Sequence, residues 1–343
     1  MNIEIKQLDE KWKTFILRND HGMEVHILNL GGIIQKIIVP NKHGDFENVV
    51  LGYDNYQEYR TDPYFFGAII GRVAGRIEGA SFEINGKKYE LERNDATNHL
   101  HSGEGFHRVF WDAEPFETSN GVGVKLSYFS KDGENGYPGN LKVNVTYVVK
   151  NDNQLVIDYL ATTDETTPLT LTNHTYFNLS GNLKDTIEHH SVRINSNNYL
   201  ELNNELIPTG KMLDTKNTPF DFSRGRILNE GITSDSEQNK VVGNGYDHYF
   251  LFDKNEKGNI EVKDEVSGRV LKIQTNQPGV VMYTSNNLEE GCELSGGVSK
   301  KYLGVCLETQ ASPASLHSKG LPSILLNKDE VYNKQTVFTF QVN

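Results

Sequence analysis

The sequence predicts an all-β protein, a large single-domain β-sandwich with very little helix. Short runs in which apolar and polar residues alternate recur along the chain, separated by Gly, Asn and Asp. No segment shows a sustained apolar repeat of 3.6 residues, and no Pro- or Ser-rich linker divides the chain, so we expect one domain over residues 1–343. So many strands in one domain need two packed sheets. A propeller is disfavoured, because no repeat of about 40 residues is found.

The expected strands are short and alternate in character. They lie at 22–32, 121–130, 141–150, 153–163, 189–202, 268–276, 279–286 and 335–343. Residues 84–92 indicate a hairpin with an Asn-Gly turn. Residues 131–140, rich in Gly, Pro and Asn, are expected to join two strands without regular structure. One or two helical turns are expected at 54–60, with Asp54 as the cap.

Composition restricts the partners and the compartment. The formal net charge is −12 and no long basic cluster occurs, so a phosphate backbone would be repelled and nucleic acid is not an expected partner. The N-terminus lacks a signal pattern and no run approaches a membrane span, so we expect a cytoplasmic protein. We also expect a monomer or homodimer that acts on a neutral small molecule. The two cysteines, Cys292 and Cys306, are expected to be buried thiols rather than a disulfide.

Several kinds of catalytic machinery are missing from the sequence. There is no complete nucleotide-binding fingerprint, no Walker loop, no HExxH and no G-x-S-x-G motif. His189-His190 and the pair His99 and His101 could suggest zinc, but no nearby Cys, His or carboxylate completes a ligand set. We therefore expect no cofactor and no metal, and acid–base chemistry on polar groups remains.

The carboxylate of Glu308 is the sharpest anomaly in the sequence. In a strand at 304–310, Cys306, Glu308 and Gln310 share one face of an otherwise apolar segment. A lone carboxylate there is costly to bury unless it is paired or functional. The alternative is a salt-bridged or solvated residue on an edge strand.

Other candidate groups each have an ordinary structural explanation. If 172–181, "TNHTYFNLSG", is a strand, His174, Tyr176 and Asn178 share a polar and aromatic face, yet His174 could simply be a hydrogen-bonded structural histidine. Arg76 could lie on the surface, His101 could hold its loop, and Asp247 could cap a turn. The pattern alone does not show that these groups meet.

At these segments the sequence resembles the aldose 1-epimerase family, the galactose mutarotases. The resemblance runs through short motifs in the family's order over nearly the whole chain. They are "LGYDNYQEY" (51–59), "PYFFGAIIGRVAGRI" (63–77), "HLHSG" (99–103), "SKDGENGYPGNL" (130–141), "NHTYFNLSG" (173–181), "YDHYF" (246–250), "NQPGVVMYTSN" (276–286) and "CLETQ" (306–310).

The resemblance implies a supersandwich of the galactose mutarotase type and interconversion of the α and β anomers of free aldohexoses such as galactose and glucose, without cofactor or metal. By position, Glu308 resembles the family's catalytic base and His174 its catalytic acid. Matches to the family's sugar-binding positions are Arg76, His101 and Asp247, and Tyr176 beside the acid is expected to contact the sugar. The family pattern is not met at Gly75, Ser102 and Val281, and these departures bear on substrate preference.

This chemistry explains the residue types. One group must remove the proton of the C1 hydroxyl and another must protonate the ring oxygen. A carboxylate with a pKa of about 4.3 is expected to be ionised at neutral pH, and an imidazole with a pKa of about 6.5 can donate.

Three other functions stay open. A glycoside hydrolase could pair Asp247 with Glu308 as its two carboxylates. A sugar-binding sandwich would need no base. An epimerase of a related sugar, such as maltose or a hexose phosphate, would use the same acid and base; the acidic composition disfavours the phosphate.

Overall fold

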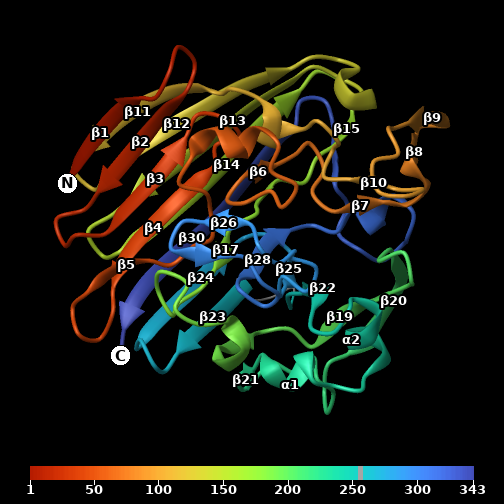
Figure 1. The fold of residues 1–343 in the computed structure, drawn as a ribbon. Coiled ribbons are helices and arrows are strands. Elements are labelled where there is room, and N and C mark those ends of the chain that lie inside the picture. Colours follow the sequence, from red (N-terminus) through yellow and green to blue (C-terminus); the bar gives the residue numbers. More distant parts are fainter. Residues whose placement is uncertain (254–257) are drawn as a thin grey trace.

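The computed structural model describes residues 1–253 and 258–343, and it confirms the all-β prediction. Three larger antiparallel sheets make up most of the molecule (Figure 1). Short two-stranded pairs and one-turn helices connect them. The chain ends marked N and C lie on the same side of the view in Figure 1.

The first sheet has five strands in sequence order. These are β1 (Asn2–Gln7), β2 (Lys13–Arg18), β3 (Glu24–Leu28), β4 (Ile34–Pro40) and β5 (Phe46–Asn48).

The second sheet has nine strands. In spatial order they are β11 (Asp112–Thr118), β12 (Gly121–Ser130), β13 (Leu141–Val149), β14 (Gln154–Thr163), β30 (Val331–Val342), β24 (Arg269–Thr275), β23 (Gly258–Asp264), β18 (Ser191–Ile194) and β21 (Arg226–Ile227).

The third sheet has six strands and carries much of the site. In spatial order they are β17 (Tyr176–Phe177), β28 (Val305–Gln310), β25 (Gly279–Tyr283), β22 (Asp247–Leu251), β19 (Asn198–Leu202) and β20 (Pro208–Asp214).

Small elements complete the described chain. The two-stranded pairs are β6 (Ile69–Ile70) with β16 (Thr172–Asn173), β7 (Arg76–Ile77) with β10 (His99–Leu100), β8 (Ser81–Ile84) with β9 (Lys87–Glu90), β15 (Thr167–Pro168) with β29 (Leu325–Leu326), and β26 (Glu293–Leu294) with β27 (Gly297–Val298). The helices are α1 (Asn229–Ile232) and α2 (Glu237–Val241), with 3₁₀ turns η1 (Tyr56–Arg60), η2 (Glu78–Ala80), η3 (Phe106–Arg108), η4 (Glu134–Gly136), η5 (Ile187–His189) and η6 (Pro313–Leu316).

The core lies between the sheets. Strand β13 alternates buried with less buried residues along its nine positions, as expected for a strand with one face on a core. Phe177 of β17 packs against Phe338 and Phe340 of β30, with ring centroids 5.5 and 6.4 Å away, so the six-stranded sheet lies on the nine-stranded one. All six residues of β28 are buried. A carboxylate on β28 is therefore inside the protein.

Most of the predicted strands are confirmed, but two predicted stretches are interrupted. Residues 189–202 form β18 and β19, because the chain crosses there from the nine-stranded to the six-stranded sheet. Residues 172–181 form β16, which pairs with β6, and β17, which pairs with β28, so that His174 lies in the break. All residues of this stretch are buried, but its expected division holds for four of them: His174 and Tyr176 line a cavity, and Phe177 and Leu179 lie in the hydrophobic core.

The turns are confirmed with smaller corrections. The hairpin at 84–92 has its Asn-Gly turn in the left-handed region, with φ of 52° and 78°. The short helix near residue 54 exists as η1, but Asp54 is not its cap: Asn55 accepts the hydrogen bond from the Gln57 N–H at 3.1 Å, and Asp54 pairs with Lys36. The loop at 131–140 contains the one-turn η4.

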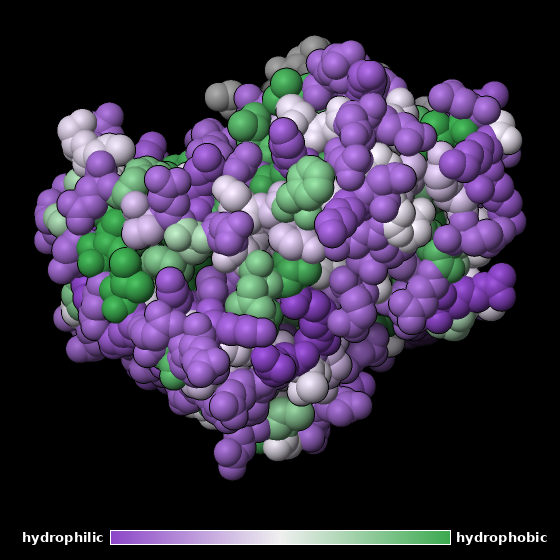
Figure 2. All heavy atoms as spheres, turned by 90° about the horizontal axis from the view of Figure 1, so that it is seen from above, coloured by the Kyte–Doolittle hydropathy of each residue, from purple (hydrophilic) through white to green (hydrophobic). Residues whose placement is uncertain are grey.

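The surface and the thiols follow the composition. The face in Figure 2 is mostly hydrophilic, with its apolar spheres in small separated groups. Over residues 1–253 and 258–343, no helix has the length and apolar character that a membrane span requires. Both cysteines are free, as expected, although Cys292 is only half-buried whereas Cys306 is fully buried.

Candidate active site

One cavity of about 290 Å³ gathers the candidate side chains. All six residues that the sequence analysis singled out line it: Arg76, His101, His174, Tyr176, Asp247 and Glu308. They come from four separate parts of the fold: β7 with the turn after β10, the β16–β17 segment, the start of β22, and β28. Each of these residues alone had an ordinary structural explanation, but such explanations do not account for all six in one cavity.

Glu308 lies in the interior of the six-stranded sheet. Strand β28 has β17 on one side and β25 on the other, and Glu308 is opposite Val281 of β25. The alternative of a solvated residue on an edge strand is therefore wrong. Burial raises the pKa of the Glu308 carboxyl well above its ordinary value; nearby Asp247 adds to this, and Arg76 opposes it. The expectation of a carboxylate ionised as it would be in water does not hold in this environment.

His174 is fixed by its backbone and faces Glu308. Its N–H donates to the Ala68 carbonyl at 2.9 Å, and its carbonyl accepts from the Gly67 N–H at 3.0 Å. The imidazole Nε2 lies 3.5 Å from Glu308 Oε1, and Nδ1 lies 3.6 Å from the sulfur of Cys306. Burial lowers the pKa of His174 to about 4, opposite to the rise expected from a neighbouring carboxylate. Burial thus shifts the two pKa values in opposite directions.

Arg76 lies at the centre of a group of charges. Its Nε donates to Asp95 Oδ2 at 2.7 Å, and its Nη1 lies 3.7 Å from Asp247 Oδ2. Burial raises the pKa of the Asp247 carboxyl, although Arg76 opposes the shift. Arg72, four residues earlier, has a different role: its buried guanidinium donates to Ser130 and to the carbonyls of Pro138 and Lys131. Of these two arginines, only Arg76 lines the cavity.

His101 is held as a neutral hydrogen-bond donor. Its Nδ1 accepts from the Gly75 N–H at 3.1 Å, so the hydrogen of the neutral ring is on Nε2. Burial, with help from neighbouring His174 and Arg76, lowers the pKa of His101 well below its ordinary value. Its ring lies edge-on to His174, with centroids 5.4 Å apart. His101 can therefore offer an N–H to a ligand without carrying charge.

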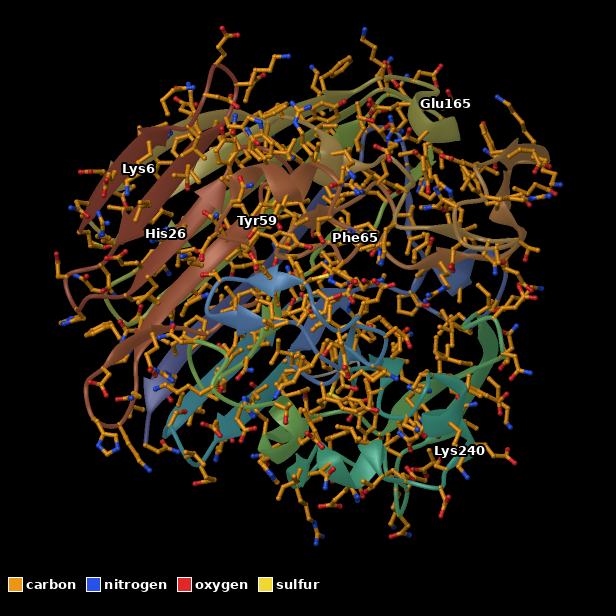
Figure 3. All side chains as sticks on the ribbon, in the orientation of Figure 1. Lys6, His26, Tyr59, Phe65, Glu165 and Lys240 are labelled. Carbon is orange, nitrogen blue, oxygen red and sulfur yellow. The ribbon has the colours of Figure 1, made fainter. Side chains whose placement is uncertain are left out.

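Tyr176 and Phe65 form the aromatic wall of the site. The Tyr176 ring lies 5.1 Å from His174, and its hydroxyl donates to the Tyr64 carbonyl at 3.0 Å. Phe65, central in Figure 3, lies 4.8 Å from His101, 4.9 Å from His107 and 5.7 Å from His174. These rings exclude water from one side of the imidazoles, which is consistent with their lowered pKa values.

A metal ion is the other ligand that this cluster could attract. His101, His174 and Glu308 offer ligand atoms within 4.8 Å of one another. A metal at Nε2 of His101 would need the lone pair of that nitrogen, and the hydrogen bond from Gly75 leaves a hydrogen on it instead. The His99–His101 pair considered in the sequence does not converge, since His99 Nδ1 bonds to the Glu92 carbonyl. The donor set therefore suits a hydroxylated ligand better than a cation.

Sequence reasoning missed the contributions of Phe65, which lines the cavity, and of Asp95, which holds Arg76. Phe65 has a φ of 59°, which is rare for a bulky residue and has no signature in the sequence. Asp95, which holds Arg76, lies in a polar turn that resembles any surface turn. Ser102, one of the departures from the family pattern, adopts a φ of 61°, and its Oγ accepts from the Val73 N–H at 2.8 Å. Gly75 has a φ of 90°, a conformation that favours glycine.

Comparisons with known proteins agree with this geometry. Residues 13–339 match the model of the aldose 1-epimerase family. The galactose mutarotase of Rattus norvegicus is 40% identical over 334 residues, covering 96% of this chain and 94% of that protein. The maltose epimerase of Levilactobacillus brevis is 30% identical over 314 residues, covering 91% and 90%. The crystal structure of galactose 1-epimerase from Lactobacillus acidophilus NCFM superimposes with a TM-score of 0.88 at 28% identity, covering 100% of this chain and 98% of that one.

Proposed function

Because the chain belongs to the aldose 1-epimerase family, whose members are isomerases, we propose that it interconverts the α and β anomers of free aldohexoses such as galactose and glucose. One observation carries the proposal: an imidazole nitrogen and a carboxyl oxygen lie 3.5 Å apart in a cavity that also holds hydrogen-bonding groups for a sugar.

In the proposed reaction, Glu308 is the base and His174 the acid. Glu308 takes the proton of the C1 hydroxyl while His174 gives the Nε2 proton to the ring oxygen, and the C1–ring oxygen bond breaks to leave an aldehyde. C1 then rotates about its bond to C2, and the ring closes on the other face of the carbonyl. Closure reverses both proton transfers, so the pair returns to its starting state. Each transfer is typically worth about 10² to 10⁴ in rate.

Three further groups are suited to hold the sugar. The Nε2–H of His101 can donate to the ring oxygen or a neighbouring hydroxyl without adding charge. Arg76 can donate to an oxygen on which negative charge develops, and its bond to Asp95 limits the loss of side-chain entropy. The carboxyl of Asp247 can accept from sugar hydroxyls. Tyr176 can contact the sugar with its ring, since its hydroxyl already bonds to the backbone.

The experiment is polarimetry of freshly dissolved α-D-galactose. The protein is expected to accelerate the change in optical rotation, and Glu308→Gln and His174→Asn are each expected to lower kcat by about 10² or more. Full activity in either variant contradicts the assignment of that residue. Retained sugar binding with no effect on optical rotation would favour a sugar-binding protein instead.

Two further substrate tests address the alternatives. Release of a phenol from an aryl glycoside would support a hydrolase that uses Asp247 with Glu308. The similarity to the L. brevis maltose epimerase makes α-maltose the second substrate to test, beside α-D-glucose. A value of kcat/KM higher for maltose than for both hexoses would replace the hexose by the disaccharide in the proposal.

A further inference from the structure

The imidazole of His174 has a neighbour on each of its two nitrogens. Glu308 lies at Nε2, and the sulfur of Cys306 lies 3.6 Å from Nδ1. Cys306 is on β28, two residues before Glu308, and is opposite Tyr176 in the pairing of β17 with β28. Cys306 is fully buried and does not line the cavity, so it reaches the reaction only through the imidazole.

The proton balance of the proposed reaction uses only Nε2. This nitrogen gives its proton to the ring oxygen on opening and takes it back on closing. If Nδ1 carried no proton, donation from Nε2 would leave an imidazolate, which is not formed near neutral pH. Nδ1 must therefore keep its proton in every state, and a buried N–H needs an acceptor.

We propose that the sulfur of Cys306 is this acceptor, and that Cys306 is a positioning residue that holds the Nδ1 proton of His174 so that Nε2 alone exchanges protons. The inference rests on the proposed function. In the free enzyme the same arrangement leaves the Nε2 lone pair facing Glu308, at a distance that one proton can cross between the two side chains.

Sulfur suits this position because it is a weak acceptor. A carboxylate at Nδ1 would stabilise the imidazolium and make it a poorer acid. Burial raises the pKa of the Cys306 thiol well above its ordinary value, so the group remains a neutral thiol rather than a thiolate. The rings of His101, Tyr176 and Phe65 around the imidazole offer no strong acceptor to Nδ1. The competing acceptor is the backbone carbonyl of His174 itself, which also accepts from the Gly67 N–H at 3.0 Å.

Two substitutions separate the hydrogen bond from packing. Cys306→Ala removes the acceptor, and Cys306→Ser replaces it with a hydroxyl of similar size. We expect kcat for galactose to fall about 10- to 100-fold in the alanine variant, because a buried N–H is left unpaired, and to stay within about threefold of wild type in the serine variant. KM is expected to change little in both. Cys292→Ala, which removes the other thiol, is the control.

Nitrogen NMR of the ¹⁵N-histidine-labelled protein shows which ring nitrogen of His174 carries the hydrogen, and a packing defect alone would not change this tautomer. In the free wild-type enzyme and in Cys306→Ser, His174 is expected to carry its hydrogen on Nδ1. In Cys306→Ala the hydrogen is expected to move to Nε2. The proposal is wrong if wild-type His174 has an unprotonated Nδ1, or if the alanine variant keeps both the wild-type tautomer and the wild-type kcat. The tautomer is read without substrate, so failure of the proposed mutarotase activity would be a separate result.

Discussion

Replacing Glu308 with Gln is predicted to lower kcat by about 10² to 10⁴ and to stabilise the fold. The carboxyl is buried at the wall of the cavity, and burial raises its pKa well above the ordinary value. A raised pKa in the folded state means that ionising the group costs more in the protein than in the unfolded chain. The amide keeps the shape of the side chain and removes this cost. Activity and stability should therefore change in opposite directions.

The magnitudes follow from the burial and from the chemistry. Loss of a general base is worth about 10² to 10⁴ in kcat, or about 3 to 5 kcal/mol of transition-state stabilisation. Each unit by which a pKa is raised costs about 1.4 kcal/mol at pH values above the shifted pKa. This net shift already includes the opposing effect of Arg76. Because burying an uncompensated polar group costs about 1 to 3 kcal/mol, we expect Glu308→Gln to raise the free energy of unfolding by an amount of that order at pH 8. The gain should shrink as the pH falls towards 4.5, because the carboxyl is then protonated in both states.

The assay is chemical denaturation at pH 5 and pH 8, alongside polarimetry at pH 8. Glu165→Gln is the matched control: Glu165 is exposed and lies away from Phe65 in Figure 3, so neither kcat nor the free energy of unfolding at pH 8 should change. A Glu308→Gln variant that is less stable than wild type at pH 8, or equally stabilised at both pH values, would refute the electrostatic reasoning. Wild-type kcat would refute the role as base.

Three other changes test the surroundings of the site. Asp95→Asn removes the charged partner of Arg76, 2.7 Å away, and should raise KM for galactose about tenfold with a smaller effect on kcat; an unchanged KM would mean that Arg76 is oriented without it. Burial lowers the pKa of His248 to about 3, so only the unfolded chain takes up this proton as the pH falls below 6.5. His248→Gln should therefore reduce the loss of stability between pH 7 and pH 5 by about 2 kcal/mol. Equal dependence of the free energy of unfolding on pH in the two proteins would contradict this. The Thr97 hydroxyl donates to Glu205, and this bond connects the tip of the β19–β20 hairpin to the turn that contains Asp95. Glu205→Ala removes the bond, so the ratio of kcat/KM for maltose to kcat/KM for glucose should rise. An unchanged ratio would show that the hairpin does not limit substrate size.

Local alternation predicted the strands well where one face of a strand meets the core. It predicted poorly where the chain changes its pairing partner, as at 172–181, because no local property distinguishes one strand from two short ones in different sheets. The error at Asp54 has a similar origin. Asp54 and Asn55 are both good caps, and the choice depends on Lys36, which a distant strand brings to Asp54.

The site was predictable as a set of residues but not as an environment. The order of motifs identified six side chains that line one cavity. The left-handed backbone of Phe65 and the tie between Arg76 and Asp95 depend on tertiary contacts that leave no mark on residue type. The pKa values are another such property. Ordinary pKa values predicted an ionised carboxylate and an imidazole that can donate a proton, and burial shifts both pKa values against these expectations.

This reversal clarifies how the proposed acid and base share protons. With the pKa of Glu308 raised and that of His174 lowered to about 4, burial favours the state in which a proton shared by the pair is on the carboxyl. Moving that proton across the 3.5 Å to Nε2 produces the carboxylate base and the imidazolium acid together, with no change in net charge. The step costs less when a sugar hydroxyl bonds to the carboxylate and the ring oxygen accepts from the imidazolium, because both bonds favour the charged forms. The substrate itself would thus create the reactive pair, and a mutarotase of this kind needs a buried site rather than strongly charged residues held apart.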